Sequence, residues 1–204
     1  SSEGMWGQRN KGDRIAAHFE KHAHRIDKAR SERFDERGWL DRFLLALPRQ
    51  AHILDLGCGG GEPIDRYLID AGHSLTGVDL AERMIALART RFPANRWLQA
   101  DMRKTAMDRA FDGVIAWDSL YHLEPEDQRD MLTRAAGWLE PDGTILFTTS
   151  PPHEEERIDG VHHAGLDAAE TRALFAELGL TEIAHAPDDI ATGGRAIWLA
   201  RKLV

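Results

Sequence analysis

One short segment constrains this chain more than any other, because glycine recurs at alternate positions directly after an apolar run. The run ends at Asp55, and Gly57, Gly59 and Gly61 follow it. Glycine has no Cβ, so such a loop can turn sharply and let a ligand approach its backbone. A strand, a glycine-rich loop and a helix in this order form the nucleotide-binding corner of an open α/β sheet.

The spacing of these glycines distinguishes two kinds of ligand. Asp55 and the glycines follow the pattern D-x-G-x-G-x-G, whereas dinucleotide-binding loops follow G-x-G-x-x-G. The dinucleotide pattern would require a glycine where Glu62 stands. An acid beside the loop repels a pyrophosphate and suits a ligand that carries an ammonium or a sulfonium group. The spacing therefore argues against a dehydrogenase with a nicotinamide cofactor.

The rest of the chain alternates between short apolar runs and amphipathic segments, which indicates strands connected by helices. The expected strands are 51–56, 74–79, 95–99, 111–117, 143–149, 180–186 and 195–202, and the expected helices are 62–71, 81–91, 125–139 and 167–178. A short connection at Gly193 and Gly194 joins the last two strands, so we expect them to pair antiparallel. The pattern predicts one Rossmann-like doubly wound α/β sheet of seven strands, with the last strand antiparallel and helices on both faces.

Residues 53–61 resemble the first motif of the class I S-adenosylmethionine (SAM)-dependent methyltransferases. Further segments resemble the family in the same order along the chain: Asp79 at the end of the next apolar run, then Asp101, then the turn at 139–147. The resemblance covers about residues 40–204. It implies a methyltransferase fold with SAM as the cofactor, and it is nearly silent on the acceptor.

The resemblance also assigns places along the cofactor to particular residues. Asp79 would accept the ribose hydroxyls, Asp101 would meet the adenine amino group, and Met102 would line the ring. Trp117 could bound the sulfonium, since aromatic faces attract cations, or it could be a core aromatic only. The implied cofactor-binding residues are Asp55, Gly57, Cys58, Gly59, Asp79, Leu80, Asp101, Met102 and Trp117.

Asp118 and His122 are the candidates for catalysis. Both follow the strand expected at 111–117, and in open α/β sheets this carboxyl edge carries the ligand crevice. A histidine beside a bound methyl donor can take a proton from a hydroxyl or amine nucleophile. Asp118 could hold a substrate amine or the methionine ammonium of the cofactor. The alternatives, a structural role for His122 and a helix cap at Asp118, stay open.

Composition and charge narrow the partners. The formal net charge is −8 and no basic block stands out, which argues against a nucleic-acid substrate. No stretch has the length of a transmembrane helix, and the lone Cys58 fits a reducing compartment. We therefore expect a cytoplasmic monomer or homodimer that acts on a small molecule and makes no membrane contact. The 10 histidines lack the spacing of a recognised zinc motif, so no metal is expected.

The first 47 residues precede the alternating core and are heavily charged. We expect helix from Asp13 to Leu47, interrupted at Gly38, and we expect residues 1–47 to form a lid over a SAM-binding core of residues 48–204. The chain is thus predicted to be a single methyltransferase domain that methylates a small molecule at oxygen, nitrogen or a carboxylate. The alternatives are methylation of protein or nucleic acid, and a non-catalytic module that binds SAM or its demethylated product, S-adenosylhomocysteine (SAH).

Overall fold

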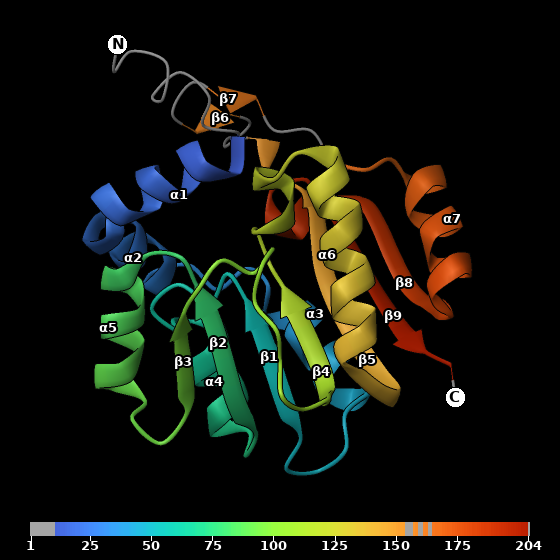
Figure 1. Ribbon diagram of the computed structural model, residues 1–204, viewed down its shortest axis with the longest axis horizontal. Coiled ribbons are helices and arrows are strands. Elements are labelled where there is room, and N and C mark those ends of the chain that lie inside the picture. Colours follow the sequence, from blue (N-terminus) through green and yellow to red (C-terminus); the bar gives the residue numbers. More distant parts are fainter. Residues whose placement is uncertain (1–10, 154–156, 159–160, 163–164, 204) are drawn as a thin grey trace.

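A central sheet of seven strands organises the part of the chain that the computed structural model describes, residues 11–153, 157–158, 161–162 and 165–203. The strands are β1 (His52–Leu56), β2 (Ser74–Asp79), β3 (Arg96–Gln99), β4 (Phe111–Ala116), β5 (Leu139–Ser150), β8 (Leu180–Asp189) and β9 (Arg195–Lys202). They lie in the order β3-β2-β1-β4-β5-β9-β8 (Figure 1).

The direction of the strands matches the prediction. β1 pairs parallel with β2 and β4, and the pairs β2–β3 and β4–β5 are parallel as well. β9 runs antiparallel to both β5 and β8, so the expected sheet with an antiparallel last strand is confirmed. The strand order reverses at β1 and β4, and in such sheets ligands bind at this point, outside the carboxyl ends of the strands.

Helices cover both faces of the sheet. They are α3 (Arg37–Leu45), α4 (Ile64–Asp70), α5 (Glu82–Arg91), α6 (Pro125–Trp138) and α7 (Ala168–Leu178). Side chains of α3, α4 and α5 form one apolar core with the sheet, and side chains of α6 and α7 form the other. Neighbouring strand residues point to opposite faces, so Ile53 joins the first core and Leu54 the second. Burial on both faces explains the continuous apolar runs that marked the strands.

Two more helices, α1 (Lys11–Lys21) and α2 (Ala23–Ser31), lie beyond the carboxyl ends of β1, β2 and β4 (Figure 1). We call this pair the helical cover. None of the helices in the described ranges is both long and apolar enough to cross a membrane.

The N-terminal region departs from the prediction. The helix expected from Asp13 to Leu47 is divided into α1, α2 and α3, and Gly38 lies inside α3 instead of interrupting it. A glycine costs a helix about 1 kcal/mol relative to alanine. Burying one large apolar side chain contributes about 1.5–3 kcal/mol, and α3 buries Trp39 and Phe43. Packing therefore outweighs the local preference of Gly38.

The segment around β5 also differs from expectation. β5 begins at Leu139, four residues earlier than the expected start at residue 143, because Leu139 already pairs with Phe111 of β4. A short hairpin of β6 (Arg157–Ile158) and β7 (Val161–His162) was not expected. Two-residue strands are too short to show a periodic pattern in the sequence.

Candidate functional site

The glycine-rich loop folds back over the end of β2. The amides of Gly57 and Cys58 donate to the carbonyl of Val78 at 2.8 and 3.0 Å, and the amide of Gly59 donates to Oδ2 of Asp79 at 2.9 Å. Gly57 and Gly59 have φ angles of +79° and +56°, a left-handed conformation that glycine adopts without strain. The acid at the end of β2 therefore holds the loop in place.

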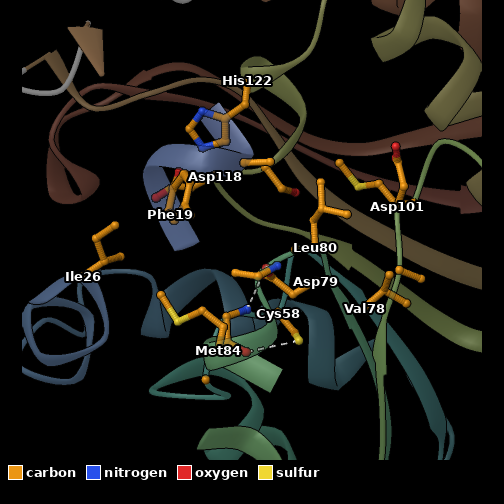
Figure 2. A pocket seen from close by; sticks show the side chains of 18 of the residues that line it. Phe19, Ile26, Cys58, Val78, Asp79, Leu80, Met84, Asp101, Asp118 and His122 are labelled. Atoms are coloured by element: carbon orange, nitrogen blue, oxygen red, sulfur yellow. Dashed lines mark hydrogen bonds between the residues drawn. The ribbon is translucent and has the colours of Figure 1, made fainter. Parts of the chain in front are cut away.

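A cavity opens beside this loop, and we call it the loop cavity. Its wall includes Gly57, Cys58, Gly59, Val78, Asp79, Leu80, Met84, Asp101, Met102, Asp118 and His122, together with residues of the helical cover. Figure 2 shows Phe19, Asp118 and His122 across the cavity from Cys58 and Met84. Seven of the nine expected cofactor residues, which follow three separate strands, thus line one space, whereas the described wall includes neither Asp55 nor Trp117.

A second pocket adjoins the loop cavity. Its wall carries the rings of His18, Phe19, Trp117, Tyr121 and His122, and we call it the ring pocket. Five residues line both spaces, and we call them the shared wall: Phe19, Ile26, Arg30, Asp118 and His122. The first three come from the helical cover and the last two from the segment after β4. Two ligands, one in each space, would therefore lie side by side.

Residues 53–143, from β1 into the first part of β5, match a family model described as a methyltransferase domain. This match covers less than half of the chain, and it includes the motifs that resemble the class I SAM-dependent methyltransferases. The motif resemblance, the sheet and this match agree on the family.

Known relatives agree with this assignment. The putative methyltransferase YqeM of Bacillus subtilis is 36% identical over 115 residues, which cover 53% of this chain and 46% of that protein. The chain spans about half the length of the curated relatives it matches.

Solved structures share the fold of this methyltransferase domain. Magnesium protoporphyrin IX methyltransferase of Synechocystis PCC 6803, with bound SAM, has a TM-score of 0.74 at 16% identity, covering 96% of this chain and 99% of that one. A 1,6-didemethyltoxoflavin-N1-methyltransferase of Burkholderia thailandensis, with its acceptor and SAH bound, has a TM-score of 0.72 at 22% identity, covering 93% and 88%. At these identities the likeness shows the common fold.

Asp79 has capacity left for a ligand. Its Oδ1 accepts from the amide of Ala81 at 2.9 Å, and its Oδ2 accepts from the amide of Gly59. Burial raises the pKa of Asp79, and these two hydrogen bonds oppose the rise. Because a carboxylate oxygen has two lone pairs, each oxygen can accept one more hydrogen bond.

Asp55 has a different environment, since the wall described for the loop cavity does not include it. It is buried at the end of β1, and its charge acts on the nearby buried carboxyl group of Asp65 of α4. Burial raises the pKa of Asp55 to about 6, and burial with the charge of Asp55 raises the pKa of Asp65 well above its ordinary range. Two buried carboxyl groups in contact cannot both ionise easily, so they hold a proton between them.

Asp101 lines the loop cavity but is engaged by a neighbour. Arg103 donates to both carboxylate oxygens, at 3.0 Å to Oδ1 and 2.8 Å to Oδ2, and also pairs with Asp13 of α1 at 2.7 Å. Burial acts to raise the pKa of Asp101, but the hydrogen bonds from Arg103 outweigh it and lower that pKa. Contact between Asp101 and an adenine amino group stays a prediction.

The helical cover is tied to the core by a second, more buried ion pair. Asp27 of α2 is bound by Arg91 of α5 through two hydrogen bonds of 2.7 Å, and the same guanidinium donates to the carbonyl of Gly60 at 3.0 Å. The side chains of Asp27 and Arg91 are 10% and 25% exposed, so solvent weakens this pair less than it weakens surface pairs. The tie joins the cover directly to the glycine-rich loop.

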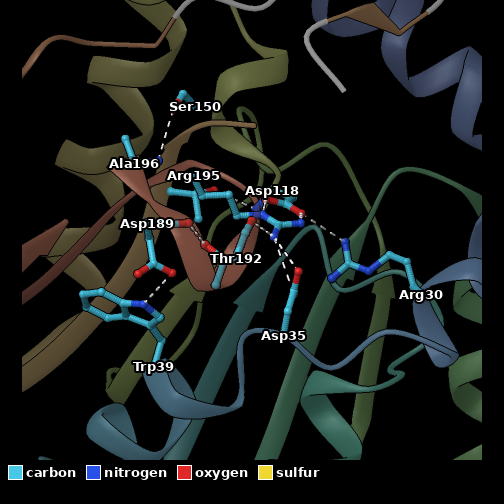
Figure 3. Close-up of polar contacts among 10 residues, drawn as sticks. Arg30, Asp35, Trp39, Asp118, Ser150, Asp189, Thr192, Arg195 and Ala196 are labelled. Carbon is cyan, nitrogen blue, oxygen red and sulfur yellow. Dashed lines mark hydrogen bonds and ion pairs between the residues drawn. The ribbon is translucent and has the colours of Figure 1, made fainter. Parts of the chain in front are cut away.

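Asp118 is the centre of a buried ion network (Figure 3). Nε and one terminal nitrogen of Arg195 donate to its two oxygens, each at 2.8 Å, and Arg30 approaches from the other side at 3.9 Å. Asp118 has a φ of +56°, and its amide donates to Oγ1 of Thr148 at 2.8 Å. Its carboxylate is thus already bound by a guanidinium, and a direct catalytic role for it stays a prediction.

His122 lines both spaces, whereas Trp117 lines only the ring pocket. His122 belongs to a short helix, η2 (Leu120–His122), and its ring packs at 5.2 Å from the ring of Phe19 and 4.5 Å from that of Tyr121. It lines both spaces, as a base beside the transferred methyl group would. Trp117 lines the ring pocket but not the described wall of the loop cavity, and its ring lies 5.5 Å from the guanidinium of Arg195.

Two expectations about reactive or metal-binding groups can be compared with the structure. Cys58 is buried in the loop, and burial raises the pKa of its thiol well above the ordinary value, so the thiol is protonated at neutral pH. Among the described residues, no group of three or more histidine, cysteine and acidic side chains is placed to hold a metal. His163 and Glu154–Glu156, whose side chains are also of metal-binding types, lie outside the described residues.

Sequence reasoning missed three charged residues of this site: Arg30, Glu36 and Arg195. Each stands in a charged or glycine-containing segment that resembles a solvated surface. Only the fold brings Arg195 to Asp118, from 77 positions away. Glycines directly before Arg195 were the one local sign of an unusual turn there.

Proposed function

We propose that the domain binds SAM in the loop cavity and transfers its methyl group to a small molecule held in the ring pocket. The shared wall carries this proposal, because methyl transfer requires a donor site and an acceptor site in contact. The lining of the ring pocket by five rings favours a small organic acceptor over protein or nucleic acid. We further propose that the protein works in the cytoplasm as a monomer or homodimer.

The residues around the loop cavity fit the cofactor in the order that the resemblance implied. Asp79 would accept the ribose hydroxyls with its remaining lone pairs. Leu80 and Met102 would flank the adenine, with Asp101 at its amino group. The loop from Gly57 to Gly59 would lie along the methionine end, because no side chain at these glycines blocks the approach.

Arg30 is suited to the carboxylate of the methionine moiety. It lines the loop cavity, and within the described chain its only ion pair is the 3.9 Å contact with Asp118. Arg103, which also lines this cavity, is already bound by Asp101 and Asp13. A guanidinium with unused donors binds a carboxylate well.

SAM supplies an electrophilic methyl group when it is bound, and the protein supplies position and environment. The shared wall holds the acceptor in line with that group. The helical cover, residues 11–31, excludes water from both spaces, and we propose that residues 1–47 form a lid over the core of residues 48–204. Orientation of two reactants in this way can provide a large part of a rate enhancement.

Calorimetry with SAH tests the cofactor site. Asp79→Ala should weaken binding by about 1–3 kcal/mol, roughly 5- to 150-fold in Kd, because two ligand hydroxyls lose their acceptor. Asp108→Ala removes an exposed acid outside both walls and serves as the matched control. Equal SAH affinity in the folded Asp79→Ala variant would remove Asp79 from the site.

A second titration tests Arg30 with a ligand pair. Arg30→Gln should raise the Kd for SAH at least tenfold and leave the Kd for 5′-methylthioadenosine, which lacks the amino-acid end, unchanged. Arg33→Gln, three residues along the chain and lining only the ring pocket, should change neither. For activity, SAM consumption is screened against phenols, alcohols, amines and carboxylic acids; tight SAH binding without turnover would favour a non-catalytic module.

A further inference from the structure

We infer that Glu36, on the wall of the ring pocket, is the base that takes the proton from the acceptor during methyl transfer. The inference rests on the proposed function and adds the general base, which the proposed function leaves unassigned. It also narrows the acceptor to a hydroxyl or an amine, because a carboxylate nucleophile has no proton to lose.

The position of Glu36 is fixed by the start of α3. Its carbonyl accepts from the amides of Trp39 and Leu40 at 3.0 and 3.1 Å. Its carboxyl makes no cap hydrogen bond to that helix. The residue is 4% exposed and lines the ring pocket, so its carboxyl group is buried where the acceptor is proposed to bind.

Glu36 also lies close to the point of transfer. Arg30 of the shared wall acts electrostatically on Glu36, and each affects the ionisation of the other. Because Arg30 lines both spaces, a group within reach of its charge is near the boundary between donor and acceptor.

The pKa values of Glu36 and its neighbour Asp35 are shifted in opposite directions. A hydrogen bond joins the carboxyl groups of Asp35 and Glu36, and Asp35 is also paired with Arg195 at 3.3 Å. Burial acts to raise the pKa of Asp35, but the hydrogen bond from Glu36 and the charge of Arg195 outweigh it and lower that pKa. Burial, followed by the hydrogen bond with Asp35, raises the pKa of Glu36 to about 7. Two acids whose environments separate their pKa values in this way are typical of acid–base sites.

The other charged groups of the ring pocket do not replace Glu36 in this role. Asp118 and Arg195 are bound to each other. Arg33 acts on Asp35, and a guanidinium has no lone pair with which to accept a proton. His18, Tyr121 and His122 are the remaining titratable groups of the wall, and His122 is the alternative base that the test must separate from Glu36.

The proposed step balances as follows. A lone pair on the acceptor's oxygen or nitrogen forms a bond to the methyl carbon of SAM. The carbon–sulfur bond breaks, and its electron pair stays on sulfur, which becomes the neutral thioether of SAH. The proton of the acceptor passes to the carboxylate of Glu36 and later to water. A base whose pKa is near the working pH is the most effective for such a transfer.

Infrared difference spectroscopy tests the acid–base property of Glu36 without an acceptor. The SAH complex is titrated between about pH 5 and about pH 9, and the protonated carboxyl band is followed. Wild type minus Glu36→Gln should isolate a band that is lost with a midpoint near pH 7, because Asp55 and Asp65 contribute equally to both. Glu32→Gln, an exposed acid at the end of α2, is the matched control and should leave the band in place. Absence of any such band between pH 6 and pH 8 would overturn the inference.

Kinetics on an acceptor found in the SAM-consumption screen tests the catalytic role. Glu36→Gln should lower kcat by about 10²–10⁴-fold, remove the acidic limb of the kcat profile and leave the Kd for SAH unchanged. Glu36→Asp keeps a carboxyl group and should restore part of the rate. If the acidic limb survives in Glu36→Gln and disappears in His122→Ala, His122 is the base and the inference is wrong. Failure of wild type to bind SAH would instead contradict the proposed function.

Discussion

Replacement of Arg195 should reveal how strongly the ion network supports the site. The side chains of Arg195 and Asp118 are 6% and 9% exposed and share two hydrogen bonds of 2.8 Å. Removing one member of such a buried pair costs about 3–5 kcal/mol, because the other charge stays buried without its main partner. Arg195→Met should therefore lower Tm by roughly 6–20 °C, at about 2–4 °C per kcal/mol for a domain of this size.

A double-mutant cycle gives the interaction itself. Asp118→Asn keeps the size of the side chain and tolerates the left-handed φ, so it removes only the charge. Urea unfolding of Arg195→Met, Asp118→Asn and the double variant should show a coupling of about 3 kcal/mol, with the double variant more stable than Arg195→Met. Arg96→Met, which breaks an exposed pair with Asp108, is the control and should change stability far less. If the changes in unfolding free energy of the two single variants add up to that of the double variant, Arg195 and Asp118 are not coupled and the argument is refuted.

Further predictions concern the loop, the buried acids, the cover and the histidine. Gly57→Ala should impair folding, because its Cβ would lie 2.6 Å from Cβ of Ser119, whereas Gly59→Ala, with no atom nearer than 4.0 Å, should fold by circular dichroism yet bind SAH poorly. The pKa of Asp55, raised from 3.8 to about 6, adds to the free energy of unfolding below pH 4, and this contribution of about 3 kcal/mol is lost as pH rises through 6. Asp55→Asn should flatten that part of the profile of unfolding free energy against pH, measured with urea. Asp27→Asn should speed hydrogen exchange across residues 11–31 relative to wild type, and SAM should slow exchange of the same residues in wild type. Identical exchange in all samples would exclude a lid. His122→Ala should keep the acidic limb of the kcat profile if Glu36 is the base, as a coupled SAH assay with an accepted phenol or amine would show.

The sequence allowed the fold to be predicted where local pattern and burial agree. Strands buried on both faces must be apolar throughout, so their positions were visible as runs, and Asp79 was visible because it ends such a run. Gly38 misled the prediction, because a local helix penalty was overruled by packing of α3 against the sheet. The cofactor side of the site follows strand ends and was therefore accessible to pattern reasoning.

The acceptor side was not accessible in the same way. Arg195 is a pocket residue only because β9 is inserted between β5 and β8, which brings it to Asp118. Asp35 and Glu36 are adjacent acids in a charged segment, and charged segments are usually solvated. Nothing in the sequence shows that Asp35 is exposed and paired with Arg195 while Glu36 is buried and has a raised pKa.

The composition of the shared wall has a consequence for the order of events in turnover. Phe19, Ile26 and Arg30 belong to the helical cover, so a single displacement of the cover opens the loop cavity and the ring pocket together. Both products then depart through one opening, and neither space is replenished while the other stays closed. If the cover acts as the proposed lid, we expect its opening to govern the release of both products. Because exposed ion pairs such as Glu20–Arg83 join the cover to α5, we expect salt to quicken product release as it weakens ligand retention.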